Sequence, residues 1–194
     1  MRLPFPSMPV FLVLVFVTFS LLATHPVHAE SFDIARLMQL LASAPEGEVA
    51  YSEKKYSALL TEPVVSSGTL SYRRPDIVEK NMVLPRKENF RIVGEALIVA
   101  RKGTEKRYPL SSQPLLSAFA ASLRGVLGGD VKLLNQHFQL ALSGSEQQWQ
   151  LEMTPTEADI TRYVERIFVT GHGSQVEQIE VREGSGDRSV LQMR

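Results

Sequence analysis

The residues that most often carry catalysis or bind metals are scarce in this chain. It has no cysteine and four histidines, and only His137 and His172 lie beyond residue 29. A zinc site would need both of these histidines together with carboxylates, and neither stands in an HExxH spacing. The GxSxG setting of a nucleophilic serine is also missing. We therefore expect no catalytic residue, no metal site and no cofactor, and we predict that the protein is not an enzyme.

The most informative run is residues 67–75, Ser-Gly-Thr-Leu-Ser-Tyr-Arg-Arg-Pro. Side chains alternate along a strand, so Leu70, Tyr72 and Arg74 share a face that is apolar until it ends in a guanidinium. Pro75 lacks a backbone donor and favours extended geometry in the residue before it. Arg74 is therefore expected at a strand end, on the inner face and near an opening. Its five donors fit either a salt bridge at the rim or a latch that bonds a helical lid.

The elements that must position these residues are mainly strands. Period-two patterns predict strands over residues 48–56, 64–74, 77–84, 90–93, 96–101, 105–110, 138–142, 147–153, 161–170, 176–182 and 189–193. Helical spacing predicts helices over residues 31–44, 114–127 and 130–137, the first capped by Ser31. About eleven short antiparallel strands favour a large curved sheet or a half-open β-barrel. The helices would then cover its concave face as a lid, in a mainly β (α+β) fold.

The first 29 residues have the features of a secretory signal peptide. Arg2 gives a positive start, residues 9–23 are apolar, and residues 27–29, Val-His-Ala, suit a signal-peptidase site. The apolar run of about 15 residues is short of the ~20 needed to span a bilayer, although an uncleaved anchor is the competing interpretation. We expect cleavage after Ala29, a periplasmic protein and a single domain over residues 30–194.

The charge of the remaining chain is balanced. Residues 30–194 carry 20 basic and 21 acidic side chains, because Arg2 is the only charged side chain before Glu30. Nucleic-acid binding needs clustered positive charge, so no nucleic-acid partner is expected. The lack of cysteine excludes a disulfide framework and attachment of lipid to this chain through a cysteine.

The run from Ser67 to Pro75, which follows an N-terminal helix and a tyrosine-containing strand, resembles the outer-membrane lipoprotein carrier (LolA-like) family. The order of elements and the ending over residues 186–193 are also similar, so the resemblance covers residues 31–194. The first strand, residues 51–56, lacks the family's phenylalanine–glutamine pairing. Val78 stands where the family often has an aromatic residue, and Lys80 stands where a tryptophan is expected. These departures indicate a divergent branch.

The resemblance implies an unclosed antiparallel barrel with a helical lid over a hydrophobic cavity. The cavity would receive acyl chains of a lipoprotein or lipid from an inner-membrane donor transporter and release them to an outer-membrane acceptor. The resemblance also gives Arg74 the role of a latch on the lid backbone, in a protein that acts as a monomer. The residues expected to line the cavity are Tyr51, Leu70, Tyr72, Val78, Met82, Phe90 and Leu97 from strands, and Leu115, Phe119 and Leu123 from the lid.

Three other interpretations stay open from the sequence. The same fold can serve as a module that senses a lipid or lipoprotein without transporting it. An enzyme that acts on an acyl substrate would need a converged acid–base pair, for which the sequence offers no obvious candidate. An unrelated β-sandwich is the third alternative.

Overall fold

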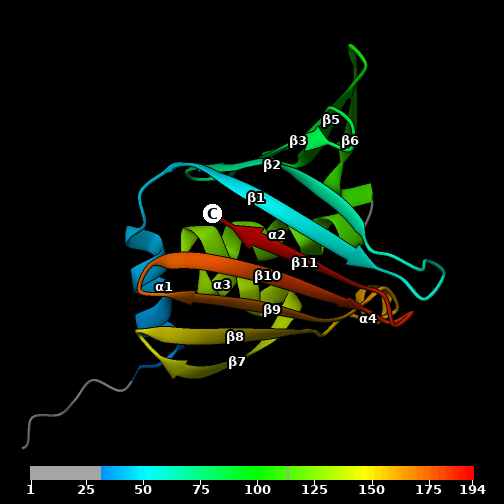
Figure 1. Ribbon diagram of the computed structural model, residues 1–194. Helices are drawn as coiled ribbons and strands as arrows, with labels where there is room; N and C mark the ends of the chain where they lie inside the picture. Colours follow the sequence, from blue (N-terminus) through cyan, green and yellow to red (C-terminus); the bar gives the residue numbers. More distant parts are fainter. Residues whose placement is uncertain (1–31, 113) are drawn as a thin grey trace, which may run out of the picture. The chain divides into compact units, whose positions relative to one another are not determined.

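The computed structural model describes residues 32–112 and 114–194, without the side chains of residues 114 and 115. Within this part of the chain, one antiparallel sheet of eleven strands dominates the fold (Figure 1). The expected signal peptide and the expected cap Ser31 lie outside the described residues. The strands are β1 (Gly47–Tyr56), β2 (Val64–Arg73), β3 (Ile77–Leu84), β4 (Glu88–Val93), β5 (Ala96–Arg101), β6 (Thr104–Pro109), β7 (Phe138–Ser145), β8 (Gln148–Pro155), β9 (Val164–His172), β10 (Gln175–Glu183) and β11 (Arg188–Met193).

The sheet is open because its two edge strands do not pair. The order is β6-β5-β4-β3-β2-β1-β11-β10-β9-β8-β7, so neighbours in space are neighbours in sequence except where β1 meets β11. That pairing runs antiparallel from Tyr51 opposite Met193 to Tyr56 opposite Arg188. Strands β6 and β7 remain as edges, and the sheet curls around helices on its concave side (Figure 1). The predicted half-open barrel of about eleven strands with a helical lid is confirmed.

Four α-helices and one short 3-10 helix are present in the described residues. They are α1 (Ile34–Ser43), η1 (Leu110–Ser112), α2 (Pro114–Gly128), α3 (Val131–His137) and α4 (Ala158–Thr161). The Asp33 carboxylate caps α1 by accepting a 2.8 Å hydrogen bond from the backbone N–H of Arg36. Asp130 caps α3 in the same way. The sequence did not predict α4, because a single turn is too short to show helical periodicity.

The connection between α2 and α3 requires a glycine at Gly129. Its φ of +66° lies in the left-handed region, which disfavours residues with a Cβ. A Cβ at this position would also lie 2.2 Å from the carbonyl oxygen of Met38. Helix α1 therefore packs directly on the α2–α3 turn, which groups the three helices inside the curved sheet.

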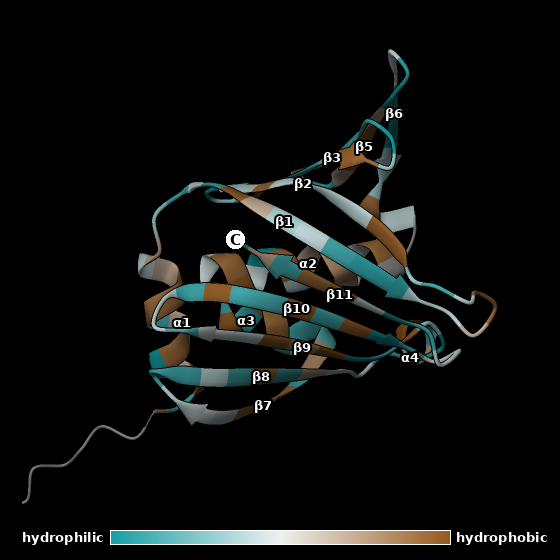
Figure 2. Cartoon of the chain, viewed as in Figure 1, coloured by the Kyte–Doolittle hydropathy of each residue, from teal (hydrophilic) through white to brown (hydrophobic). Residues whose placement is uncertain are grey.

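Two clusters of buried apolar side chains fill most of the space between helices and sheet. The first joins α1, α2 and α3 to β7–β10 and includes Leu37, Leu134 and Leu151, all fully buried. The second joins α2 and η1 to β1–β4. Leu123 of α2 packs against both clusters. Figure 2 shows the corresponding pattern, with apolar residues spaced along the strands and gathered on the helices. Helix α2 thus couples the two halves of the sheet.

Replacing Leu151 by alanine tests whether the first cluster supports the whole fold. Leu151 is 0% exposed, so Leu151→Ala is expected to lower the free energy of unfolding by about 2–5 kcal/mol. Leu59 is 93% exposed, and Leu59→Ala is the matched control with an expected change within about 0.5 kcal/mol. Urea unfolding followed by far-UV circular dichroism measures both, and equal effects of the two changes would contradict this assignment of the core.

Candidate functional site

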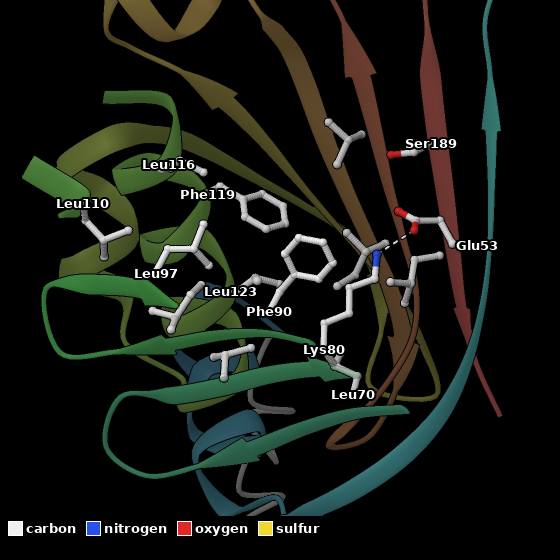
Figure 3. A pocket seen from close by; sticks show the side chains of 15 residues that line it. Glu53, Leu70, Lys80, Phe90, Leu97, Leu110, Leu116, Phe119, Leu123 and Ser189 are labelled. Atoms are coloured by element: carbon white, nitrogen blue, oxygen red, sulfur yellow. Dashed lines mark hydrogen bonds and ion pairs between the residues drawn. The ribbon is translucent and has the colours of Figure 1, made fainter. Parts of the chain in front are cut away.

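A cavity of about 290 Å³ lies between α2 and the concave side of the sheet (Figure 3). This volume is close to the lower end of the roughly 300–1,000 Å³ typical of pockets for small molecules. Three of its lining residues are polar, namely Glu53, Lys80 and Ser189. The other twelve are apolar: Leu70, Val78, Phe90, Ile92, Leu97, Leu110, Leu116, Phe119, Leu123, Ile179, Val181 and Leu191. The cavity therefore offers an almost continuous apolar surface with one small polar area.

Strand register explains why the wall of this cavity is apolar. Residues directly opposite each other in an antiparallel pair project to the same side of the sheet. Val78 of β3 lies opposite Ile92 of β4, which lies opposite Leu97 of β5. In the next row, Leu70 of β2 lies opposite Lys80 of β3. Two rows of facing residues thus line this half of the cavity, and α2 covers them.

The structure brings six of the ten predicted lining residues together around this cavity. They come from four strands and from α2, at positions that are distant in sequence. They are Leu70, Val78, Phe90, Leu97, Phe119 and Leu123.

The other four predicted lining residues have different positions. Tyr51 is only 3% exposed and lies beneath Lys80, whose ammonium nitrogen is 4.9 Å from the centre of the tyrosine ring. Tyr72 lines a second, more open cavity of about 620 Å³ near the C-terminal end of α1. Met82 is half-buried and is not among the residues that line either cavity. Leu115 belongs to α2, but its side chain lies outside the described part of the chain.

Several lining residues were missed in the sequence, for two different reasons. Ile92 stands two positions after Phe90, and Lys80 two positions after Val78, so strand alternation alone places each pair on one face. The contributions of β10 and β11, such as Ile179 and Leu191, had no comparable pattern. They reach the cavity only because β11 pairs with β1, a contact between residues more than 130 positions apart.

Arg74 joins the end of β2 to the end of α1. Its guanidinium donates hydrogen bonds of 2.6 and 2.9 Å to the carbonyl oxygens of Ala42 and Ala44. These carbonyls belong to the last turn of α1 and its C-cap, where backbone acceptors have no partner within the helix and where a positive charge is favourable. Glu46 accepts a 3.0 Å hydrogen bond from the Arg74 backbone N–H and lies 3.8 Å from its guanidinium. Arg74 therefore fastens α1 to the rim of the sheet.

A second arginine, Arg124, fastens α2 to the same rim. Its guanidinium donates a 3.0 Å hydrogen bond to the carbonyl oxygen of Asp76 and a further one to that of Gly94. These carbonyls lie in the β2–β3 and β4–β5 turns. The sequence offered no motif for this residue, since the two turns approach α2 only in the folded sheet.

Each histidine of the described residues pairs with one acidic side chain. No group of three or more histidine, aspartate or glutamate side chains there is arranged to hold a metal ion. His137 and His172 each contact one glutamate, Glu157 at 2.6 Å and Glu177 at 2.9 Å. Among the described residues, every helix falls short of the length and hydrophobicity that a membrane span requires.

Burial raises the pKa of the Tyr51 hydroxyl, and the negative charge of Glu53 raises it further. Ser66 lowers the pKa of Tyr51 to a smaller extent. The Ser66 hydroxyl donates its own hydrogen bond to Glu53, at 3.0 Å. The Tyr51 hydroxyl is buried and has no hydrogen-bond partner among the described residues. It therefore stays protonated well above neutral pH and contributes no hydrogen bond to stability.

Tyr51→Phe tests this environment through the pH dependence of stability. A raised pKa in the folded state means that folding favours the neutral hydroxyl. The contribution of Tyr51 to the free energy of unfolding is therefore complete below the pKa of the unfolded state, and it is lost as the pH rises through the pKa of the folded state. Removing an unpartnered hydroxyl should change stability by no more than about 1 kcal/mol at pH 7. From about pH 9 to pH 11, Tyr51→Phe should lose less stability than the wild type. Urea unfolding across this range is the measurement, with Tyr163→Phe at an exposed position as control; parallel curves for Tyr51→Phe and wild type would contradict the assignment.

Several solved structures are similar to this chain at low sequence identity. A LolA superfamily protein from Nitrosomonas europaea aligns with a TM-score of 0.45 and 11% identity, covering 83% of this chain and 89% of the other. An outer-membrane lipoprotein-sorting protein domain from Vibrio parahaemolyticus gives 0.46 and 11%, covering 82% and 88%. The lipoprotein LppX of Mycobacterium tuberculosis gives 0.41 and 12%, covering 83% and 92%. A comparison with curated protein sequences gives no match.

The family comparison covers most of the chain. The sequence model described as outer membrane lipoprotein carrier protein LolA-like matches residues 26–192. This range includes every helix and strand of the structure described above except Met193, the last residue of β11. The chain belongs to the LolA-like family of outer membrane lipoprotein carrier proteins.

Proposed function

We propose that this protein is a periplasmic carrier that shields the acyl chains of a lipoprotein or lipid during transfer from the inner to the outer membrane. The observation that carries the proposal is the cavity beneath α2, with twelve apolar residues among its fifteen lining residues. Burying a methylene group is worth about 0.8 kcal/mol, so a 16-carbon chain avoids roughly 12 kcal/mol of contact with water. A largely apolar cavity of this kind suits an acyl chain better than a polar solute.

Membership of the family supports the same function. LolA-like proteins are lipid-binding carriers rather than enzymes, and they act in the periplasm or otherwise outside the cytoplasm. The signal peptide expected at residues 1–29, cleaved before a single domain over residues 30–194, would deliver this chain to the periplasm. An inner-membrane transporter as donor and an outer-membrane protein as acceptor complete the proposed route.

A carrier must also release what it binds, and the two rim arginines support a mechanism for release. Arg74 bonds the end of α1 and Arg124 bonds α2 to turns of the sheet. These charge-assisted bonds stabilise the arrangement in which the helices cover the sheet. An acyl chain that enlarges the cavity competes with this closed arrangement, because both use the same apolar surface. Closure then favours transfer of the chain to an acceptor.

Native mass spectrometry of the protein purified from its own periplasm tests whether it carries acyl ligands. We expect a bound lipid or acylated polypeptide on the wild type. Phe119 lines the cavity and is 42% exposed, so Phe119→Asp places a charge on the apolar wall without requiring a fully buried carboxylate. It should lower the bound fraction at least about tenfold.

Tyr163→Asp is the matched control for this variant. Tyr163 is an aromatic residue of similar exposure, 53%, and it does not line the cavity. The control should retain bound ligand. The absence of any acyl ligand on the wild type, or equal loading of the two variants, would contradict the carrier function.

Arg74→Leu tests the latch. Without the two hydrogen bonds to α1, the closed empty form loses stabilisation, so the variant should load cargo normally and release it about tenfold more slowly. The measurement is transfer of a radiolabelled acylated peptide from the loaded protein to outer-membrane vesicles. Arg166→Leu is the control, since Arg166 pairs with Glu152 at 3.0 Å on strands outside the rim. Unchanged transfer by Arg74→Leu would count against the latch, and binding without any transfer by wild type would favour a sensing module.

A further inference from the structure

The cavity contains an ion pair on one side of its otherwise apolar wall. The ammonium nitrogen of Lys80 lies 2.6 Å from Oε2 of Glu53. Figure 3 shows this pair beside Ser189, with Leu97, Leu110 and Leu116 on the opposite side of the cavity. A ligand that fills the cavity would therefore meet polar groups at one end and only apolar groups at the other.

The pair is held in place by its surroundings but is not saturated with hydrogen bonds. The Ser66 hydroxyl donates to the same Glu53 Oε2 at 3.0 Å, and the Lys80 ammonium lies over the ring of Tyr51. Among the described residues, the other carboxylate oxygen of Glu53 accepts no hydrogen bond. An ammonium has three N–H donors, of which Glu53 takes one. The side chains of Lys80 and Glu53 are 26% and 22% exposed, so donors and an acceptor remain available from the cavity.

A second inward-facing carboxylate has two cationic partners. Glu88 lies on β4 opposite Met82 and is 7% exposed. One oxygen of Glu88 contacts both Arg86 at 3.0 Å and Arg101 at 2.9 Å. Glu88 does not line the cavity. Glu53 differs in having a single cationic partner and in lining the cavity.

An ion pair of this kind is unfavourable for a cavity that holds alkyl chains alone. Removing two charges from water costs free energy that their attraction only partly returns, and apolar replacements are often neutral or stabilising. The pair is also neutral as a unit. A carboxylate ligand that bonded Lys80 would lie within a few ångströms of Glu53, and like charges at that distance repel. An uncharged group that both donates and accepts hydrogen bonds complements the free oxygen of Glu53 and the free N–H groups of Lys80.

We propose that Glu53, Lys80 and Ser189 form a head-group subsite that selects acyl ligands with an uncharged amide or hydroxyl next to the chain and disfavours free fatty-acid anions. The inference rests on the proposed carrier function, since it concerns the same cavity. The acyl tail extends from this subsite towards Leu97 and Leu110, and the amide or hydroxyl lies between Lys80 and Glu53. The amide of an acylated polypeptide and that of a free N-acyl lipid share this chemistry.

Three probes with the same 12-carbon acyl group test the subsite: N-lauroylethanolamine, methyl laurate and laurate. Binding of each to the purified protein is measured at pH 8 by isothermal titration calorimetry. The wild type should bind N-lauroylethanolamine about tenfold more tightly than either of the other two. An N-lauroyl tripeptide amide, as a stand-in for acylated polypeptide, separates the two sources by binding more tightly or less tightly than N-lauroylethanolamine.

Two double variants connect this selectivity to the pair. Glu53→Gln with Lys80→Met should bind N-lauroylethanolamine and methyl laurate within about twofold of each other. Glu53→Lys with Lys80→Glu keeps a neutral pair in reversed orientation and should keep the selectivity, which gives a second route if the first variant is poorly folded. Glu152→Gln with Arg166→Gln removes an ion pair outside the cavity and is the matched control.

The outcomes separate this subsite from the carrier function. Tightest binding of laurate by the wild type, or undiminished selectivity in Glu53→Gln with Lys80→Met, would overturn the subsite and leave the carrier function intact. Equal binding of all three probes by the wild type would also overturn the subsite without affecting the carrier function. Failure of all probes to bind would overturn both proposals together.

Discussion

The pairing of β1 with β11 is the interaction on which the rest of the structure depends. It joins six N-terminal strands to five C-terminal ones in one sheet, through antiparallel register from Tyr51–Met193 to Tyr56–Arg188. With it, the sheet becomes wide enough to curl, and its unpaired edges β6 and β7 leave the curl open. The concave apolar face then has to be covered by helices.

Helix α2 meets that requirement while leaving space beneath it. Small residues such as Ala118, Ala120 and Ala121 are almost fully buried, which lets the helix approach the sheet closely along part of its length. Larger side chains, Phe119 and Leu123, hold it away elsewhere and border the cavity. Arg124 and Arg74 add hydrogen bonds to carbonyl oxygens at the rim to the apolar packing of α1 and α2.

The polar area inside the cavity is where this chain differs most from a simple container for alkyl chains. Lys80 occupies the position at which the resemblance to the family predicts a tryptophan, and its partner Glu53 lies on a different strand. A tryptophan would have added apolar area at this wall. A lysine paired with a glutamate instead adds hydrogen-bonding capacity at a cost in desolvation. The substitution therefore changes what the cavity can distinguish more than how much it can bury.

The sequence by itself determined the strand pattern, the helices of the lid and much of the inner face of β2–β5. Strand alternation around Leu70, Val78 and Phe90 is local, because neighbouring side chains on a strand must point to opposite sides. The sequence also indicated that Arg74 stands at a strand end, since Pro75 follows it. It did not reveal the single turn α4, the Asp33 cap or the position of Tyr51 beneath Lys80, each of which depends on neighbours or on too few residues to form a pattern. Only the tertiary structure decided that Leu191 and Leu70 line the same cavity, that Arg124 reaches two turns and that Glu53 meets Lys80. These contacts join residues far apart in sequence, and the register that creates them is a property of the whole sheet.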